Sequence, residues 1–504
     1  MDRMTRLGFL QGASASVGAI FGGSLFAACP GWRPQGRPIL AFGVVADTHI
    51  RTSPLDGRAI DKDWTGVYFE SALKHFRERN VRAVVHCGDF AHLGQVVEMQ
   101  AHAKIWRKVF PGNKTADGHE VAKLFVTGNH EFCSHIGGNN GAFVRRLYPK
   151  KKDWDEAVLQ VDTARKWHRI WGEDYRDVWH REVGGFHFFG WQYGADLGKM
   201  AALLDESIKT FGLAKSDRPL FFVGHVPQGR PRRIVEVLKR HGCRNAVAFY
   251  GHNHYSAANL NTFANASDTM TFINVPCCAP WYGAVLLHDE NVSAAGRIEG
   301  REAAEKPHSR QGLVVSLYGG MMVVERHDFG NGGKLGPDLM LPFGRRNPHP
   351  WSWGELKRNS EAPQFRKGAR LEVGFGRKKH RRLQGEHSSF SPSTSGSLRI
   401  VIPNADGNPD SRVYVYEVAV ADKKTTATDA RKFGPSRLCK AVYAAGCNFG
   451  VGHEPDKGVT ALEIPYAELP PGKTCFVAVY PLNSLGISGR PITACLKIGQ
   501  ERRQ

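Results

Sequence analysis

Short apolar runs alternate with segments of helical appearance through the first half of the chain. Five runs predict strands that are buried on both faces, and they span residues 39–46, 81–85, 123–127, 220–223 and 246–250. Residues 64–80 and 94–109 look helical and separate the first three runs. Because strands and helices alternate along the chain, this half is predicted to fold as an α/β core.

Each of the five runs ends in a cluster of Asp, His and Asn residues. Ligands bind beyond the carboxyl ends of the strands in sheets of this kind, so we expect the five clusters to converge at one edge. The candidate metal ligands are Asp47, His49, Asp89, Asn129, His225, His252 and His254.

The chemistry of these seven side chains favours divalent metal ions. Asp, Asn and His suit borderline and hard metals such as Mn, Fe and Zn, and the lack of a thiolate in the set disfavours a structural zinc site. Seven ligands are too many for one ion and fit two ions that share a bridging carboxylate. Two metals roughly 3.5–4 Å apart can stabilise both the attacking and the leaving oxygen of an in-line displacement.

The joint pattern of motifs is more informative than any single motif. Asp-x-His occurs often by chance, Gly-Asp is more often a turn, and one His is more often a satisfied core or surface residue. Here five motifs follow one another in a single order, each at the end of a predicted strand. A purely structural origin for all five is therefore the weaker interpretation.

That order of motifs resembles the calcineurin-like metallophosphoesterase family, from about residue 37 to residue 345. The motifs are Asp47-x-His49, Gly88-Asp89, Gly128-Asn129-His130-Glu131, Gly224-His225 and Gly251-His252-x-His254. The resemblance implies a four-layer α/β/β/α sandwich around a di-metal site. By matching motifs, the first ion would be held by Asp47, His49, Asp89 and His254. The second ion would be held by Asp89, Asn129, His225 and His252, with Asp89 as the bridge.

The resemblance also implies catalytic roles for Asp89, His130 and Glu131. His130 would contact the phosphate or protonate the leaving oxygen, as suits an imidazole, and Glu131 would orient it. The nucleophile would be a metal-bound hydroxide. Purple acid phosphatases have Tyr where this chain has His92 and lack the His of the first motif, so the chain resembles the non-purple branch. We interpret His92 as a neighbour of the site or a surface residue rather than a ligand.

These observations predict an exported hydrolase of phosphate mono- or diesters that acts on a small phosphorylated substrate with two divalent ions (Mn, Fe or Zn). The alternative hypothesis is a non-catalytic surface lipoprotein that uses the same fold for binding. All seven candidate ligands are present, which favours the enzyme. Near-zero metal content after reconstitution would instead favour the lipoprotein.

Residues 1–29 are predicted to be an export signal. Arg3 and Arg6 form a short basic start, and residues 7–28 are apolar or small and carry no charge. The alternative, an N-terminal membrane helix, is disfavoured by the Gly and Ser residues that interrupt this stretch. Phe-Ala-Ala-Cys at its end resembles a bacterial lipobox, in which Cys29 would carry the lipid. The predicted location is therefore the bacterial periplasm or cell envelope.

The segment after the third motif carries weaker signals. Residues 132–185 are rich in Trp, Arg and Lys and look helical around Trp154–Trp171. We interpret this segment as a packed cap, with a lid or pocket wall as the alternative. Further candidate substrate contacts, for which packing is the favoured interpretation, are Asn139, Asn140, Tyr175, Tyr255, Trp281 and Tyr282.

The last third of the chain is predicted to be a separate β-rich module. Residues 312–329 read as two strands around Gly319-Gly320 and close the catalytic domain at residues 37–345. Residues 346–394 are predicted to be a basic linker. Residues 395–504 are predicted to form a small all-β sandwich that resembles a fibronectin type III module. Its expected strands span residues 397–402, 412–420, 461–464, 474–480 and 492–498.

Composition and charge refine this picture. The 504 residues include 68 Lys and Arg against 48 Asp and Glu, a net charge of +20, and residues 345–382 hold 12 against 3, or +9 of it. Because much of the excess lies in one connecting segment without a zinc-finger or RNA-binding signature, no nucleic-acid-binding module is predicted. Ten Cys are too few for a disulfide scaffold, although Cys475 and Cys495 on neighbouring predicted strands are candidates for pairing.

Overall fold

The computed structural model describes most of the predicted catalytic region and the strands of the C-terminal region. The described residues are 34–52, 65–135, 162–226, 231–254, 257, 263–265, 269–279, 298–299, 310–329, 333–344, 360–376, 396–406, 413–424, 437–444, 459–470, 472, 474–483 and 485–497. The predicted export signal therefore lies outside the described residues. Within them, no helix is long and apolar enough to span a bilayer.

Two sheets form the centre of the N-terminal region. The first has the order β13-β12-β11-β1-β2-β3, with β14 also paired to β12. Its strands are β1 (Leu40–Val45), β2 (Ala83–His86), β3 (Ala122–Phe125), β11 (Gln311–Tyr318), β12 (Met321–Asp328), β13 (Gly333–Lys334) and β14 (Leu339–Pro342). The second has the order β4-β5-β6-β7-β9-β8. Its strands are β4 (Val178–Val183), β5 (Phe186–Trp191), β6 (Leu220–Val223), β7 (Ala246–Tyr250), β8 (Phe263–Asn265) and β9 (Met270–Asn274).

An apolar core lies between the two sheets and explains why their central strands read as continuous hydrophobic runs. Phe42 of β1 packs edge-on against Phe188, Phe221 and Phe249 of the facing sheet, with ring centroids 5.3, 5.2 and 5.9 Å apart. The β1–β2, β2–β3, β5–β6 and β6–β7 pairs are all parallel. Parallel strands that are covered on both faces have no polar face, so no alternation appears in the sequence.

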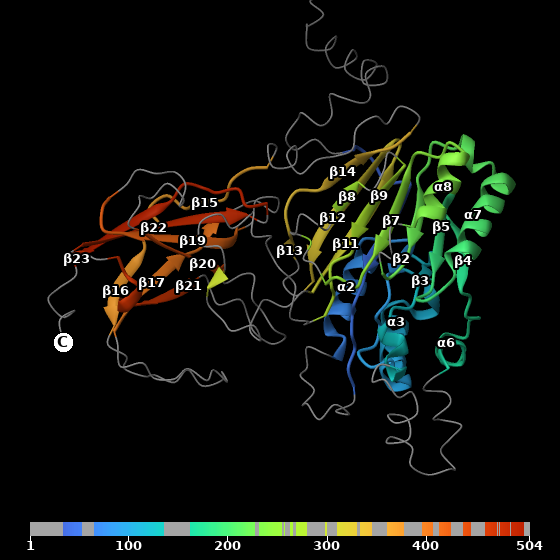
Figure 1. Ribbon diagram of the computed structural model, residues 1–504, viewed down its shortest axis with the longest axis horizontal. Helices are drawn as coiled ribbons and strands as arrows, with labels where there is room; N and C mark the ends of the chain where they lie inside the picture. Colours follow the sequence, from blue (N-terminus) through green and yellow to red (C-terminus); the bar gives the residue numbers. More distant parts are fainter. Residues whose placement is uncertain are drawn as a thin grey trace, which may run out of the picture.

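Helices cover the outer face of each sheet (Figure 1). α2 (Val67–Glu78), α3 (Val96–Val109) and α6 (Thr163–Trp171) pack on the first sheet. α7 (Leu197–Phe211) and α8 (Arg232–Arg240) pack on the second. The predicted α/β core and its four layers, α/β/β/α, are therefore confirmed, and α2 and α3 lie within the two segments expected to be helical. Short 3-10 helices are η3 (Pro111–Asn113), η4 (His130–His135), η6 (Leu213–Lys215) and η12 (Tyr466–Glu468).

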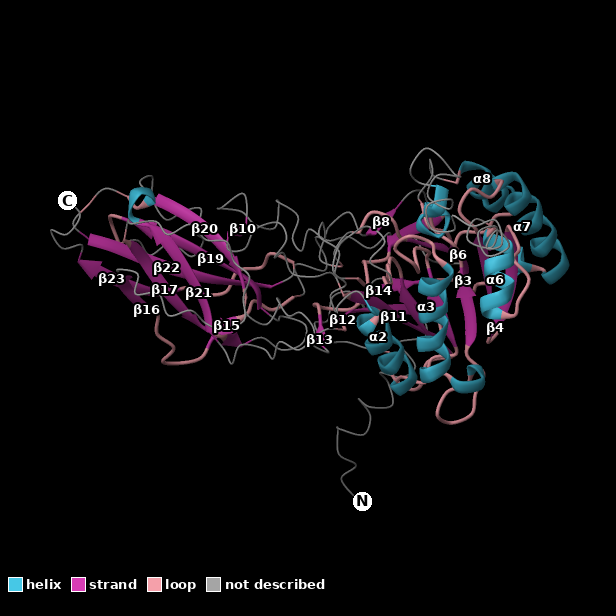
Figure 2. Ribbon diagram, turned by 90° about the horizontal axis from the view of Figure 1, so that it is seen from below, coloured by secondary structure: helices cyan, strands magenta, loops and turns pink. Residues whose placement is uncertain are grey.

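The C-terminal region is rich in antiparallel sheet and forms a body beside the layered part (Figure 2). Its sheets have the orders β10-β20-β19-β22-β23, β16-β17-β21 and β15-β18. The bounds are β10 (Ile298–Glu299), β15 (Gln364–Phe365), β16 (Glu372–Gly376), β17 (Ser397–Pro403), β18 (Ala405–Asp406), β19 (Val413–Ala421), β20 (Arg437–Tyr443), β21 (Val459–Pro465), β22 (Thr474–Asn483) and β23 (Ile492–Lys497). One apolar cluster joins the first two of these sheets. The resemblance to fibronectin type III stays a prediction.

Pairing in the C-terminal region differs from the sequence expectation in two places. β15 and β16 lie within the segment predicted to be a linker, yet they pair with β18 and β17. β10 lies within the range predicted for the catalytic domain, yet it pairs with β20. The linker prediction rests on Pro, Ser, Gly and charge. These composition signals do not reveal a short strand that pairs only with a distant partner.

The candidate disulfide between Cys475 and Cys495 does not form. Cys475 is opposite Leu496, and Cys495 is opposite Phe476, so the two cysteines are offset by one residue along the β22–β23 pair. A one-residue offset puts side chains on opposite faces of a sheet. In agreement, Cys475 is buried and Cys495 is exposed, and both are free thiols.

Candidate metal centre

The loops that follow β1, β2, β3, β6 and β7 meet at one edge of the two sheets, as the sequence predicted. The amide of Asp47 donates to the carbonyl of Gly88 at 3.0 Å, and the amide of His49 donates to the carbonyl of Asp89 at 3.0 Å. On the facing sheet, the amide of Gly251 donates to the carbonyl of His225 at 3.0 Å. The first two motifs are therefore bound to each other, and so are the last two.

Most of the candidate ligands have an unusual backbone conformation. Among the described residues, seven that are not glycine have positive φ, and five of these are candidate ligands. Their φ values are 53° for Asp47, 41° for His49, 57° for Asp89, 73° for His252 and 51° for His254. Left-handed backbone is unfavourable for side chains with a Cβ and concentrates at functional sites, where the surrounding structure holds it in place.

One group of side chains matches the ligand set expected for the first ion. Asp47, His49, Asp89 and His254 each bring one ligand atom within 4.8 Å of the others, a group that could hold a metal ion. Nε2 of His49 lies 3.1 Å from Nε2 of His254 and 3.7 Å from Oδ2 of Asp89. Nε2 of His254 lies 3.6 Å from Oδ1 of Asp47.

A second group matches the set expected for the second ion. Asp89, His225 and His252 form another cluster that could hold a metal ion. The Asn129 side-chain oxygen joins it, 2.9 Å from Nε2 of His225 and 3.0 Å from Nδ1 of His252. Nε2 of His225 lies 3.1 Å from Oδ2 of Asp89, the same oxygen that faces His49. Asp89 is thus common to both groups.

The remaining atoms of these side chains are held by the backbone. Nδ1 of His225 donates to the carbonyl of Cys87 at 2.7 Å, which leaves Nε2 to face the centre. Oδ1 of Asp89 accepts from the amide of His130 at 2.8 Å, which leaves Oδ2 to face both groups. The carboxylate of Asp47 accepts from the amide of His252 at 3.1 and 3.0 Å.

The pKa shifts reflect a buried cluster of opposite charges. Burial lowers the pKa of His49 well below its usual value, against the pull of Asp89. Burial also opposes a charged His225, but the neighbouring Asp89 carboxylate raises the pKa of His225 to about 9. Burial disfavours the Asp89 carboxylate too, yet His225 holds the pKa of Asp89 well below its usual range. A proton on His225 and a divalent cation would therefore compete for the same nitrogen.

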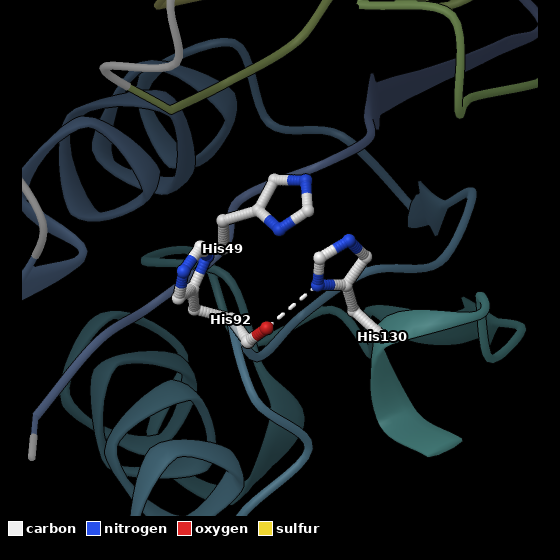
Figure 3. A group of neighbouring side chains, drawn as sticks. All are labelled: His49, His92 and His130. Carbon is white, nitrogen blue, oxygen red and sulfur yellow. Dashed lines mark hydrogen bonds between the residues drawn. The ribbon is translucent and has the colours of Figure 1, made fainter. Parts of the chain in front are cut away.

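His92 and His130 lie beside His49 of the first group (Figure 3). The ring centroids of His49 and His130 are 4.5 Å apart, and those of His92 and His130 are 5.8 Å apart. Nδ1 of His130 donates to the backbone carbonyl of His92 at 2.6 Å. That bond sets the His130 ring, so its Nε2 nitrogen is the one available for chemistry.

Glu131 is arranged differently from expectation. Its fully buried carboxylate accepts from the backbone amides of Asp89 at 3.0 Å, Ala91 at 3.1 Å and Gly128 at 2.6 Å. These bonds connect the loops after β2 and β3. Burial, followed by the charge of Asp89, raises the pKa of Glu131 to about 8. Glu131 therefore organises the loop that carries Asp89, instead of orienting the His130 ring as the resemblance implied.

Comparison with known families agrees with this geometry. The family model for calcineurin-like phosphoesterases matches residues 40–256, the range that contains all five motifs. These residues belong to the calcineurin-like phosphoesterase family. The phosphoesterase domain thus includes all seven candidate ligands together with His130 and Glu131.

Solved structures similar to the chain include a predicted phosphoesterase, a vacuolar sorting protein and PhoD. A predicted phosphoesterase from Streptococcus pneumoniae TIGR4 has 12% identity and a TM-score of 0.25, with 61% of this chain and 99% of that chain covered. Vacuolar Protein Sorting 29 from Cryptosporidium parvum has 11% identity and a TM-score of 0.26, with 61% of this chain and 98% of that chain covered. PhoD has 11% identity and a TM-score of 0.33, with 62% of this chain and 70% of that chain covered. A search of the curated proteins gave no match.

The structure adds residues of the phosphoesterase domain that the motifs did not reveal. The Gln192 side-chain oxygen accepts from the Thr127 amide at 2.7 Å, just before the third motif. Lys166 of α6 contacts two loops of the site. The sequence around Lys166 contains a pattern that predicts its burial. The buried face of α6 consists of Thr163, Lys166, Trp167, Ile170 and Trp171. A lysine within an apolar stripe of helical period is the feature that sequence reasoning passed over.

Of the six candidate substrate contacts, the structure describes only Tyr175. Asn139, Asn140, Tyr255, Trp281 and Tyr282 lie outside the part of the chain that the structure describes. Tyr175 is described, and its hydroxyl lies 3.3 Å from Oγ1 of Thr127. Burial raises the pKa of Tyr175 to about 12. This tyrosine packs the segment after α6 against the third motif.

Proposed function

We propose that this protein is an exported phosphoesterase that uses two divalent metal ions to hydrolyse phosphate mono- or diesters. One observation carries the proposal. A single oxygen, Oδ2 of Asp89, lies 3.7 Å from Nε2 of His49 and 3.1 Å from Nε2 of His225, in two adjacent groups that each could hold a metal ion. A carboxylate shared in this way is what a two-metal site requires.

The donor set fits Mn, Fe or Zn. The ions would be held by carboxylate oxygens, an amide oxygen and imidazole nitrogens, without a thiolate, which is the donor chemistry that these metals accept in catalytic sites. When bound, the ions would supply positive charge to the phosphate oxygens and lower the pKa of water. Nε2 of His225, in the second group, already faces the centre, because Nδ1 of the same ring donates to the Cys87 carbonyl.

The protein groups around this set would orient the ester and move a proton. In hydrolysis, water oxygen attacks phosphorus, the bond from phosphorus to the ester oxygen breaks, and the leaving oxygen takes a proton. His130 is the residue that we assign to this transfer, because its Nδ1 is occupied by the His92 carbonyl and its ring stacks edge-on to His49. Glu131 supports the site indirectly, through the loop of Asp89.

Export completes the proposal. The basic start, apolar stretch and Phe-Ala-Ala-Cys of residues 1–29 support secretion to the periplasm or cell envelope, with Cys29 as the point of membrane anchoring through a lipid. Mass spectrometry of the N-terminus of the protein made in a bacterial host tests this part. A lipidated Cys29 supports anchoring through a lipid, whereas an intact N-terminus contradicts cleavage of an export signal and lipidation of Cys29.

The catalytic proposal is tested with the purified full chain and added Mn²⁺. We expect metal-dependent turnover of p-nitrophenyl phosphate or bis-p-nitrophenyl phosphate, and about two bound ions per chain by elemental analysis. Lack of metal-dependent turnover of both esters and of a nucleotide and phospholipid panel would contradict the proposal. Near-zero metal after reconstitution would support the non-catalytic lipoprotein instead.

A further inference from the structure

Lys166 is a fully buried lysine that does not belong to any of the five motifs. It lies on α6, in the segment between the third motif and β5, and its side chain is 0% exposed. Lysine is almost never fully buried, because an ammonium that leaves water must be compensated by polar partners. The contacts of Lys166 therefore indicate what its burial achieves.

The ammonium of Lys166 joins two loops of the phosphoesterase site. Its Nζ donates to the carbonyl of Gly94 at 2.7 Å and to the carbonyl of Glu131 at 3.0 Å. Gly94 is two residues after His92, and Glu131 directly follows His130. The two acceptors thus flank the His92–His130 pair, whose own hydrogen bond spans 2.6 Å.

The loop of His92 is pressed closely against the loop of His130 at this point. Gly94 has φ of 65°, and a Cβ placed on it would lie 2.5 Å from the carbonyl oxygen of His130. The buried carboxylate of Glu98 in α3 accepts from the amides of Leu93 at 2.9 Å and Gln95 at 3.2 Å. The loop is therefore held by Glu98 of α3 and by Lys166 of α6.

α6 is itself firmly docked, so it can act as a fixed support. Trp167 and Trp171 belong to the apolar core on the outer face of the first sheet. The guanidinium of Arg107 in α3 donates to the carbonyl of Ile170. At the N-terminus of the helix, the Asp162 carboxylate accepts from the Arg165 amide at 2.9 Å. An apolar side chain of similar length would fill the same space without the desolvation of a charge, so packing alone does not account for lysine.

We propose that Lys166 is a positioning residue that holds His130 against the His92 carbonyl and so places the His130 ring for proton donation to the leaving oxygen. The inference rests on the proposed phosphoesterase function. It assigns to the segment after the third motif, which contains none of the candidate ligands, a direct part in the geometry of the site. A displacement of about 1 Å at a catalytic group can lower a rate by about 100-fold, which is the scale that this support would protect.

The test compares Lys166→Met with Arg165→Met in the full chain. Met keeps most of the length of the lysine side chain and removes its donors. Arg165 is a matched control on the same helix with a side chain that is 71% exposed. With phenyl phosphate, whose leaving oxygen needs a proton, we expect Lys166→Met to lower kcat about 10–100-fold. With 2,4-dinitrophenyl phosphate, whose leaving group needs none, kcat should stay within about 3-fold, with metal content unchanged.

A second readout does not depend on activity. Amide hydrogen exchange of the metal-free protein should be faster in peptides that contain residues 92–95 and 130–132 in Lys166→Met, but not in Arg165→Met. If Lys166→Met does not fold, Lys166→Gln, which keeps a donor, is measured in its place and should show the same changes to a smaller extent. A folded variant with wild-type exchange, or with equal losses on both esters, overturns the proposal. If the wild type is inactive but Lys166→Met shows faster exchange, only the phosphoesterase function is contradicted. The role of Lys166 in holding the loops of His92 and His130 would then stand.

Discussion

Oδ2 of Asp89 and Nε2 of His225 lie 3.1 Å apart, although 136 residues separate them and they come from different sheets. The loop after β2 provides the carboxylate, and the loop after β6 provides the imidazole. Since the same oxygen faces His49, removal of the Asp89 charge should weaken both groups of candidate ligands together.

Asp89→Asn is therefore expected to lower metal-dependent turnover by more than about 100-fold, since even groups that only orient metal ligands contribute about 10–100-fold. Bound metal should fall in parallel, as measured by elemental analysis after dialysis. Asp117→Asn is the control, because that side chain is 44% exposed and outside the site. Wild-type metal content in Asp89→Asn would contradict a shared ligand.

His130→Ala should separate proton transfer from metal binding. Loss of a positioned general acid costs about 10²–10⁴-fold in rate. We expect a loss of that size in kcat with phenyl phosphate and a metal content close to that of the wild type, because Nδ1 of His130 is bound to the His92 carbonyl and His130 is not one of the seven candidate ligands. His168→Ala, at a 67% exposed position of α6, serves as the control. A His130→Ala protein that has lost its metal would show that His130 acts as a ligand.

Glu131→Gln should reduce stability. The carboxylate accepts from three backbone amides, whereas a Gln side chain would direct an NH₂ group at one or more of these donors. Leaving buried donors without an acceptor costs about 1–3 kcal/mol in the free energy of unfolding, which urea titration followed by fluorescence can measure. The exposed Glu206→Gln should leave the free energy of unfolding within about 0.5 kcal/mol of the wild type. Equal stabilities of the two variants would contradict this role for Glu131.

The pair of Glu325 and Arg79 predicts a dependence of stability on pH. Burial opposes ionisation of Glu325, but its hydrogen bond to His327 and the charge of Arg79 lower the pKa of Glu325 from 4.5 to about 2. An acid with a lowered pKa in the folded state stabilises the protein above its unfolded pKa, and that contribution disappears as the pH falls toward the folded value. The wild type should therefore exceed Glu325→Gln in unfolding free energy at pH 7, and the difference should shrink between pH 4.5 and pH 2. A difference that is constant with pH would contradict the interaction.

Truncations should show where the C-terminal region begins. A chain that ends at residue 394 keeps β16 but loses β17, its partner, so an unpaired edge strand remains. A chain that ends at residue 345 removes both strands. Because unpaired edges promote association, we expect the longer truncation to aggregate more than the shorter one in light scattering. Equal behaviour would indicate that residues 360–376 act as a linker.

Much of the fold and the set of candidate ligands could be predicted from the chain alone. Buried parallel strands are continuous apolar runs with polar clusters at their ends, so the sequence predicts the five strands and puts seven candidate ligands directly after them. The limits of β6 and β7 agree with the expectation residue for residue. Residues 346–394 are predicted to be a linker, but they contain β15 and β16. The sequence does not reveal these strands, because they depend on partners that lie farther along the chain.

The sequence by itself determined which side chains stand at the strand ends, since local hydrophobic pattern and turn residues act over a few positions. Only the tertiary structure decided which atoms face each other. Three contacts join segments that are tens of residues apart. Oδ2 of Asp89 faces His49, Nδ1 of His130 donates to the His92 carbonyl, and Nζ of Lys166 donates to the Gly94 carbonyl. Such contacts follow from the packing of sheets and helices, in which backbone carbonyls and amides act as partners. Because every residue type carries a backbone carbonyl and every type except proline carries an amide N–H, no local pattern of side chains predicts these contacts.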